Sequence, residues 1–310
     1  MSFLCAPMAE LSHRALRELI EGFGGCDEYF TEMISAAALF GGGPFEVWYM
    51  DSGPRPEKLI FQLVGADIEQ IVKAAALLDR QECAGIDINM GCSAPLIRKT
   101  GAGVAWMTSI DRAGELIGRV RQAVKRRLSV KLRIGFEDDF DYLVRFCRRL
   151  EAEGTELITL HPRTAGEKFK RKARWEYVGR LRQELGIPVA GNGDIASAED
   201  LLYRADGSCD AVMVGRAAVR QPWIFAQARK TLAQSFTNEN AIEETGLRFL
   251  ELLARYQPPE FHLSRARRFF AFFCDNLKWG NYLKNQLNRE HDLPGIERVW
   301  REYFREHEPA

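Results

Sequence analysis

Short apolar runs alternate with longer amphipathic stretches over most of the chain, which is typical of strand–helix units repeated around a parallel sheet. The apolar runs predict eight strands, at residues 3–7, 29–32, 59–63, 86–89, 129–133, 157–161, 188–190 and 211–214. The amphipathic stretches predict helices at residues 12–21, 67–80, 111–125, 139–153, 175–185, 197–204 and 222–234. Ser12 and Asp67 are the expected caps of the first two helices. We therefore predict an α/β fold, a closed (β/α)8 TIM barrel. An open doubly wound sheet is the alternative, but no Gly-x-Gly-x-x-Gly motif opens a helix.

Strand patterns end near Thr237, and helical patterns follow at residues 243–255, 264–277 and 294–304. We predict a barrel domain over residues 1–236 and a small all-helical domain over residues 237–310. The stretch 264–277 is apolar on one side and basic on another. That pattern fits either a solvated face of a helical bundle or a contact with RNA.

Composition excludes several classes of protein. No apolar run approaches the ~18 residues of a membrane span, and we expect no membrane association. The seven cysteines form no Cys-x-x-Cys pair, which predicts neither a metal site nor a disulfide framework and favours a reducing cytoplasm. The 43 basic and 43 acidic side chains balance. Basic residues nevertheless gather in residues 163–174 and 263–289, so the balanced total does not exclude a local basic face.

Reactive side chains recur where the predicted strands end, and the C-terminal ends of the strands form the active site of a TIM barrel. Glycine-rich turns at residues 191–194 and 215–216 predict a site for a phosphorylated ligand. Lys131, Gln62 and His161 favour a flavin ring as part of that ligand, because they offer a cation and mixed hydrogen-bonding groups. A lysine that snorkels and a structural histidine are the plainer alternatives.

Cys92 follows the fourth predicted strand in a Gly-Cys-Ser turn, so we expect its thiol to lie exposed in the barrel mouth. A cysteine with a pKa near ~8.5 is mostly protonated at neutral pH and can act as a general acid. The alternatives are a nucleophile activated by His161 or Lys131, or a passive core residue. The other six cysteines are expected to be buried.

Six motifs resemble, in order, those of the bacterial tRNA-dihydrouridine synthases. They lie at residues 6–9, 89–92, 130–135, 161–164, 191–195 and 214–218. The resemblance implies FMN as the cofactor and NADPH as the electron donor. It implies that a uridine of tRNA is flipped onto the flavin, receives hydride at C6 and takes a proton at C5 from Cys92. It also implies a tRNA-binding role for the helical domain.

The resemblance assigns residues to each part of this site. FMN contacts are expected from Pro7, Met8, Ala9, Gln62, Lys131, His161, Asn192, Gly193, Asp194, Gly215 and Arg216. Substrate contacts are expected from Asn89, Arg163, Lys170, Arg171, Arg265, Arg267 and Arg268. A monomer is expected. Ser93, Glu10 and Pro162 depart from the usual family residues. A flavin-dependent dehydrogenase of a free pyrimidine and an RNA-binding protein without activity are the alternative functions.

Overall fold

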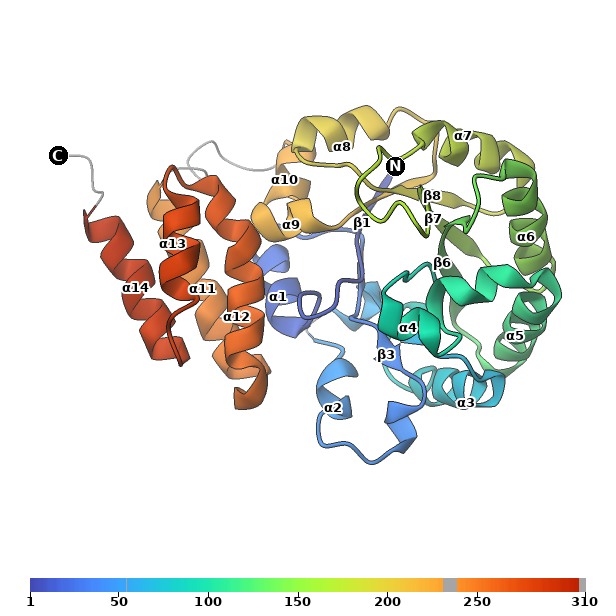
Figure 1. Ribbon diagram of the computed structural model, residues 1–310, viewed down its shortest axis with the longest axis horizontal. Helices are drawn as coiled ribbons and strands as arrows, with labels where there is room; N and C mark the ends of the chain where they lie inside the picture. Colours follow the sequence, from blue (N-terminus) through green and yellow to red (C-terminus); the bar gives the residue numbers. More distant parts are fainter. Residues whose placement is uncertain (54, 231–238, 307–310) are drawn as a thin grey trace.

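The computed structural model describes residues 1–53, 55–230 and 239–306 and has a closed parallel barrel at its centre (Figure 1). The strands are β1 Ser2–Cys5, β2 Glu28–Phe30, β3 Ile34–Ser35, β4 Leu59–Val64, β5 Gly85–Met90, β6 Arg127–Gly135, β7 Leu157–Thr164, β8 Val189–Asn192 and β9 Ala211–Val214. Their order is β2-β1-β9-β8-β7-β6-β5-β4-β3, and a further pairing of β2 with β4 closes the ring. β3 is an extra short strand beside β4. The TIM barrel and all eight predicted strands are confirmed.

The barrel helices are α1 Arg14–Gly22, α2 Glu46–Tyr49, α3 Ile68–Leu78, α4 Pro95–Lys99, α5 Ile110–Ala123, α6 Phe140–Ala152, α7 Trp175–Glu184, α8 Ala198–Arg204, α9 Arg216–Arg220 and α10 Ile224–Ala228. The short 3-10 segments are η1 Ala38–Phe40, η2 Pro56–Lys58 and η3 Gly103–Thr108. Asp67 caps α3 as expected, accepting a hydrogen bond from the Gln70 N–H at 2.9 Å.

The predicted cap of the first helix was wrong. His13 is the N-cap of α1 and makes no side-chain capping bond. The Ser12 hydroxyl is engaged elsewhere, because it accepts from the Met8 N–H at 2.9 Å and donates to the Met8 carbonyl at 3.1 Å. It therefore closes the turn after β1 instead of the first turn of α1. The helix predicted at 222–234 is shorter than expected: in this range the described residues form α10 Ile224–Ala228, and residues 231–234 lie outside the described residues.

The barrel interior changes character along its axis. Toward the N-terminal ends of the strands it is filled by an apolar plug that includes Leu4, Phe30, Ile60, Leu157 and Met213. Toward the C-terminal ends of the strands the inward positions become polar, and the buried members include Gln62, Asp87, Ser129, Asn89 and His161. Hydrophobic packing alone does not account for such a layer, because polar groups are costly to bury.

The C-terminal part consists of α11 Glu239–Tyr256, α12 Pro259–Phe273, η5 Cys274–Asn276, α13 Gly280–Leu287 and α14 Leu293–Glu306. The three helices predicted here are confirmed, and the predicted boundary between residues 236 and 237 lies outside the described residues. The sequence pattern missed α13, whose buried residues are only Gly280, Leu283 and Leu287. None of the described helices is long and apolar enough to cross a membrane.

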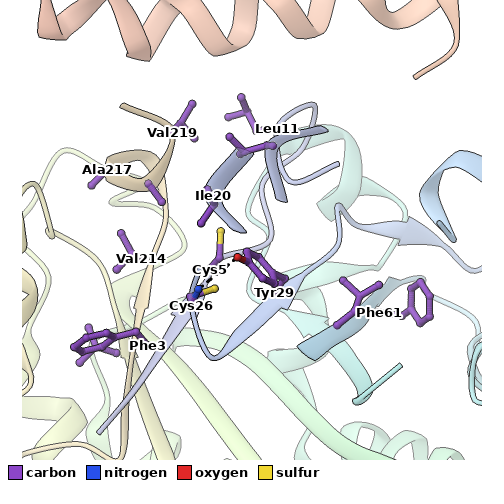
Figure 2. Packing of buried hydrophobic residues seen from close by; sticks show 14 of the residues in the cluster. Phe3, Cys5, Leu11, Ile20, Cys26, Tyr29, Phe61, Val214, Ala217 and Val219 are labelled. Carbon is purple, nitrogen blue, oxygen red and sulfur yellow. Dashed lines mark hydrogen bonds between the residues drawn. The ribbon is translucent and has the colours of Figure 1, made fainter. Parts of the chain in front are cut away.

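The helical part packs directly on the barrel. In Figure 1 its red and orange helices stand beside α1 and α9, and α11 contacts α1 while α12 contacts α9. Figure 2 shows Leu11 and Val219 at the side of the barrel that faces the pale orange helix. Both parts contribute to one continuous hydrophobic core, which extends to Phe269 and Trp300. The phenyl rings of Phe249 and Phe269 stack in it with centroids 3.7 Å apart. The helical part is therefore a packed layer of the molecule.

Candidate active site

Polar side chains from several strands meet at the C-terminal mouth of the barrel. The Lys131 ammonium on β6 donates to the Asn192 amide oxygen on β8 at 3.0 Å. The Asn89 amide on β5 donates to the Gln62 amide oxygen on β4 at 2.9 Å. Residues distant in the sequence are thus brought together, as expected for the ends of parallel strands.

Cys92 lies in the loop between β5 and α4. Among the seven cysteines, all of which are described, Cys92 is partly exposed and the other six are buried. Its main chain is held on both sides: the Cys92 N–H donates to Asn89 Oδ1 at 2.8 Å, and the Cys92 carbonyl accepts from the Val104 N–H at 3.0 Å. Pro95 opens α4, a position at which proline costs no helical hydrogen bond.

The hydrogen bond from the Val104 N–H to the Cys92 carbonyl depends on the neighbouring Gly103, which has no side chain. A Cβ atom at Gly103 would lie 2.5 Å from the Cys92 carbonyl oxygen, and its φ of +61° disfavours other residues. Gly103→Ala is expected to displace the Cys92 loop and to lower the free energy of unfolding by about 1–3 kcal/mol. Urea unfolding measures this change. The matched control is Gly22→Ala, where no atom lies within 4 Å of the added Cβ. Equal losses in the two variants would contradict the prediction.

Lys131 and His161 give the mouth its charge pattern. Burial and the nearby Arg133 guanidinium lower the pKa of Lys131 to about 8. Burial, and then Lys131 and the surrounding arginines, hold the pKa of His161 far below its ordinary value. The imidazole is therefore neutral at physiological pH. Its Nε2 lies 2.8 Å from the Arg163 guanidinium, which can only donate, so the ring proton resides on Nδ1.

Arg163 is 2% exposed. Besides His161, its guanidinium donates to the Arg171 carbonyl at 2.5 Å and to a carboxylate oxygen of Asp194. Arg163 therefore orients His161 and ties two loops of the mouth together, and its contact with the substrate or the flavin edge stays a prediction.

Gln62 is fully buried, and both ends of its amide are engaged within the protein. Its Nε2 donates to Asp87 Oδ2 at 2.7 Å, while its oxygen accepts from Asn89. Asp87 is a residue that sequence reasoning missed, although an acidic residue inside the apolar run 86–89 was a visible signal. It also accepts from the Ser129 hydroxyl at 2.6 Å. Burial raises the pKa of Asp87 from 3.8 to about 6.

The raised pKa predicts a pH-dependent stability. Between pH 4 and pH 6 the folded protein holds a proton on Asp87 that the unfolded chain releases, so this residue contributes less stability as the pH rises. Asp87→Asn removes that dependence. The free energy of unfolding of Asp87→Asn minus that of the wild type is expected to increase by roughly 2–3 kcal/mol between pH 4 and pH 7. Urea unfolding at both pH values measures it, and a difference that stays constant would contradict it.

The glycine-rich turns after β8 and β9 lie next to one another, since their strands pair. Gly193 has a φ of +123°, and a Cβ there would lie 3.0 Å from the His161 ring. The Asp194 carboxylate accepts from the Ala173 N–H at 2.6 Å and so serves the loop after β7. Gly215 and the exposed Arg216 follow β9. Pro7 and Met8 are partly exposed and Ala9 is exposed on the turn after β1.

Phe169 is a second residue that the sequence reasoning missed. It is 59% exposed on the loop after β7. The centroid of the Phe169 ring lies 6.0 Å from that of His161. The Arg216 guanidinium lies 4.5 Å from the centroid of the Phe169 ring. An aromatic residue within the basic stretch 163–174 was the available signal. Phe169 therefore adds an exposed aromatic face to the mouth.

The predicted substrate-binding cations separate into two groups. Lys170, Arg171 and Arg268 are exposed. Arg265 is 3% exposed and pairs with the buried Glu32 carboxylate at 2.9 Å, so the expected surface contact is corrected to a buried ion pair. Arg267 is partly buried and donates to the Glu290 carbonyl at 2.7 Å.

Comparisons with known proteins give a consistent result. A family model described as "Dihydrouridine synthase (Dus)" matches residues 4–304. A "Probable tRNA-dihydrouridine synthase" of Aquifex aeolicus is 33% identical over 233 residues, which are 73% of this chain and 72% of that protein. A "Probable tRNA-dihydrouridine synthase 1" of Synechocystis is 27% identical over 292 residues, covering 92% and 81%. Among solved structures, a point mutant of morphinone reductase in complex with tetrahydroNAD has a TM-score of 0.53 at 11% identity, covering 75% of this chain and 87% of that one.

Proposed function

The chain belongs to the dihydrouridine synthase family, and from this premise we propose that it reduces the C5=C6 bond of uridines in tRNA with FMN and NADPH. The observation that carries the proposal is the mouth itself. A partly exposed thiol on the loop after β5 lies there with a lysine on β6 and a neutral histidine on β7. The homologues support tRNA as the substrate, and the finer assignments below are inferences from these contacts.

The residues at the mouth suit both the ring and the phosphate group of FMN. Lys131 supplies a cation, His161 supplies one N–H donor from Nδ1, and Gly193, Gly215 and Arg216 offer donors for a phosphate. Pro7, Met8 and Ala9 would form the rim. When bound, FMN would supply the hydride for the uracil ring. Gln62, Asn192 and Asp194 would act mainly by holding their neighbours, because their side chains are already engaged with other groups of the protein.

Cys92 is the proposed general acid. Its loop is held to Asn89, and the second amide hydrogen of Asn89 would donate to a uracil carbonyl. The thiol gives its proton to C5 of the uracil, and solvent restores it after the product leaves. Asn89 thus orients the loop and the base together.

The tRNA would contact two exposed basic regions. Lys170 and Arg171 lie on the loop after β7, and Arg268 lies on α12, 4.0 Å from Glu10 on the turn after β1. We propose residues 1–236 as the catalytic domain and 237–310 as the tRNA-binding domain. A flipped uridine would then reach the mouth between these regions, where Phe169 offers a face for stacking.

The experiment starts from purified protein and tRNA that lacks dihydrouridine. A flavin absorbance near ~450 nm and formation of dihydrouridine with NADPH are expected. Colourless protein that binds tRNA would indicate the RNA-binding alternative. Reduction of free uracil or orotate at rates equal to those with tRNA would indicate the dehydrogenase alternative. Either result would overturn the proposal.

A further inference from the structure

Beneath the barrel mouth, a continuous chain of hydrogen bonds runs from a buried carboxylate to the loop of Cys92. Ser129 Oγ donates to Asp87 Oδ1 at 2.6 Å, and Gln62 Nε2 donates to Asp87 Oδ2 at 2.7 Å. Asn89 Nδ2 then donates to Gln62 Oε1 at 2.9 Å. At the far end, Asn89 Oδ1 accepts from the main-chain N–H groups of Gly91 at 3.2 Å and Cys92 at 2.8 Å.

This hydrogen-bond chain has a direction, and Asp87 sets it. An ionised carboxylate can only accept hydrogen bonds, so Gln62 must turn its NH2 group toward Asp87. The Gln62 oxygen then faces Asn89, which must donate to it from its own NH2 group. The Asn89 oxygen is thereby left for the two N–H groups of the cysteine loop. Reversing either amide would bring two donors or two acceptors together.

Stability does not explain the carboxylate. Asp87 is fully buried directly above the apolar plug of the barrel, where an ionised group is costly even with two donors. Lys131 on the adjacent strand donates to Asn192 and not to Asp87, so the carboxylate has no ion-pair partner within hydrogen-bond distance among the described residues.

We propose that Asp87 is a positioning residue whose carboxylate fixes the direction of the Gln62–Asn89 hydrogen bonds and so holds the loop that carries Cys92. The inference rests on the proposed function, because it assigns Asp87 to the placement of the proposed proton donor. Asp87 touches neither the base nor the cofactor in this role. It acts through the two amides and the main chain of residues 91 and 92.

The test uses the full-length protein with its flavin as isolated, and compares three variants. Asp87→Asn keeps the shape, but asparagine satisfies its neighbours in either orientation, so the direction of the hydrogen bonds is no longer fixed. Gln62→Met breaks the connection one link nearer to Cys92. Ser129→Ala is the matched control, because it removes a hydrogen bond from the same carboxylate and leaves the direction intact.

Two measurements are made at pH 8. The first is the rate at which iodoacetamide alkylates Cys92, which is selective because the other cysteines are buried. Asp87→Asn and Gln62→Met are each expected to raise it about threefold or more, as the loop loosens. The second is tRNA turnover, where kcat is expected to fall about tenfold to a hundredfold in Asp87→Asn while KM for tRNA changes less than about twofold. Ser129→Ala is expected to stay within about twofold in both measurements.

The outcomes separate the two proposals. An alkylation rate in Asp87→Asn equal to that of the wild type would overturn the positioning role, as would equal changes in Ser129→Ala and Asp87→Asn. A thermal midpoint of Asp87→Asn at least as high as that of the wild type supports it, since a purely structural role would lower the midpoint. If the wild type forms no dihydrouridine, the proposed function fails, while the alkylation rates still decide the role of Asp87.

Discussion

Arg265→Met is expected to lower the free energy of unfolding by about 3–5 kcal/mol, because it leaves the Glu32 carboxylate buried without its cation. Both side chains are nearly inaccessible, and the guanidinium lies 2.9 Å from Glu32 Oε2. The other oxygen of Glu32 accepts from the Glu10 N–H at 2.5 Å. This one carboxylate therefore joins α12 to the turn after β1, where Glu10 has a φ of +63°. Urea unfolding followed by tryptophan fluorescence measures the loss.

Two controls make this prediction specific. The double variant Glu32→Gln/Arg265→Met removes the unpaired charge and keeps an acceptor for Glu10, so most of the lost stability should return. Arg268→Met changes an arginine that is 53% exposed on the same helix and should stay within about 0.5 kcal/mol of the wild type. It should instead weaken tRNA binding and reduce the slope of affinity against salt by about 1. A stability loss in Arg268→Met equal to that in Arg265→Met would show that burial of the ion pair is not the cause.

Cys92→Ala is expected to reduce the rate of dihydrouridine formation by about 10²–10⁴-fold, the usual contribution of a positioned general acid. Flavin absorbance and tRNA affinity should stay close to those of the wild type, since alanine removes one partly exposed sulfur atom. Cys92→Ser should remain slow, because a hydroxyl is a much weaker acid than a thiol. Single-turnover kinetics on unmodified tRNA measure the chemical step.

Cys209→Ala provides the matched control for this second prediction. Cys209 is buried just before β9, at the end of the barrel opposite the mouth, and its thiol lies 3.5 Å from the Arg204 carbonyl. Its replacement should leave the rate within about twofold of the wild type. A rate for Cys92→Ala as high as that of Cys209→Ala would exclude proton donation by Cys92.

The strands were predictable because each is a short apolar run that must be buried on both faces of a parallel barrel. The first helix cap was not predictable, since Ser12 has two competing uses and the turn at Met8 takes its hydroxyl. The helix α13 escaped for a related reason. It buries few side chains, and its place comes from packing against α12 and α14, which a local pattern does not report.

The site was predictable by position and less so by role. Lys131 within its predicted strand, His161 at the end of the next strand and Cys92 just after a strand were predicted to be neighbours, because barrel geometry brings adjacent parallel strands together at one mouth. Sequence could not tell which arginines reach solvent. Arg163 and Arg265 are buried by loops and helices from elsewhere in the chain, whereas Arg268, on the same helix as Arg265, is exposed.

The continuous core between barrel and helices has one more consequence. If cations on α12 bind tRNA, this binding surface cannot move relative to the mouth. The reason is that α12 packs on α9 and is connected through Glu32 to the turn after β1. The distance between the RNA-binding residues of α12 and the barrel mouth is then fixed. Nucleotides at one separation from the gripped part of the RNA reach the thiol, and others do not. Choice of uridine would then be set by a length built into the fold, and small changes in how α12 is seated would move the selected position along the RNA.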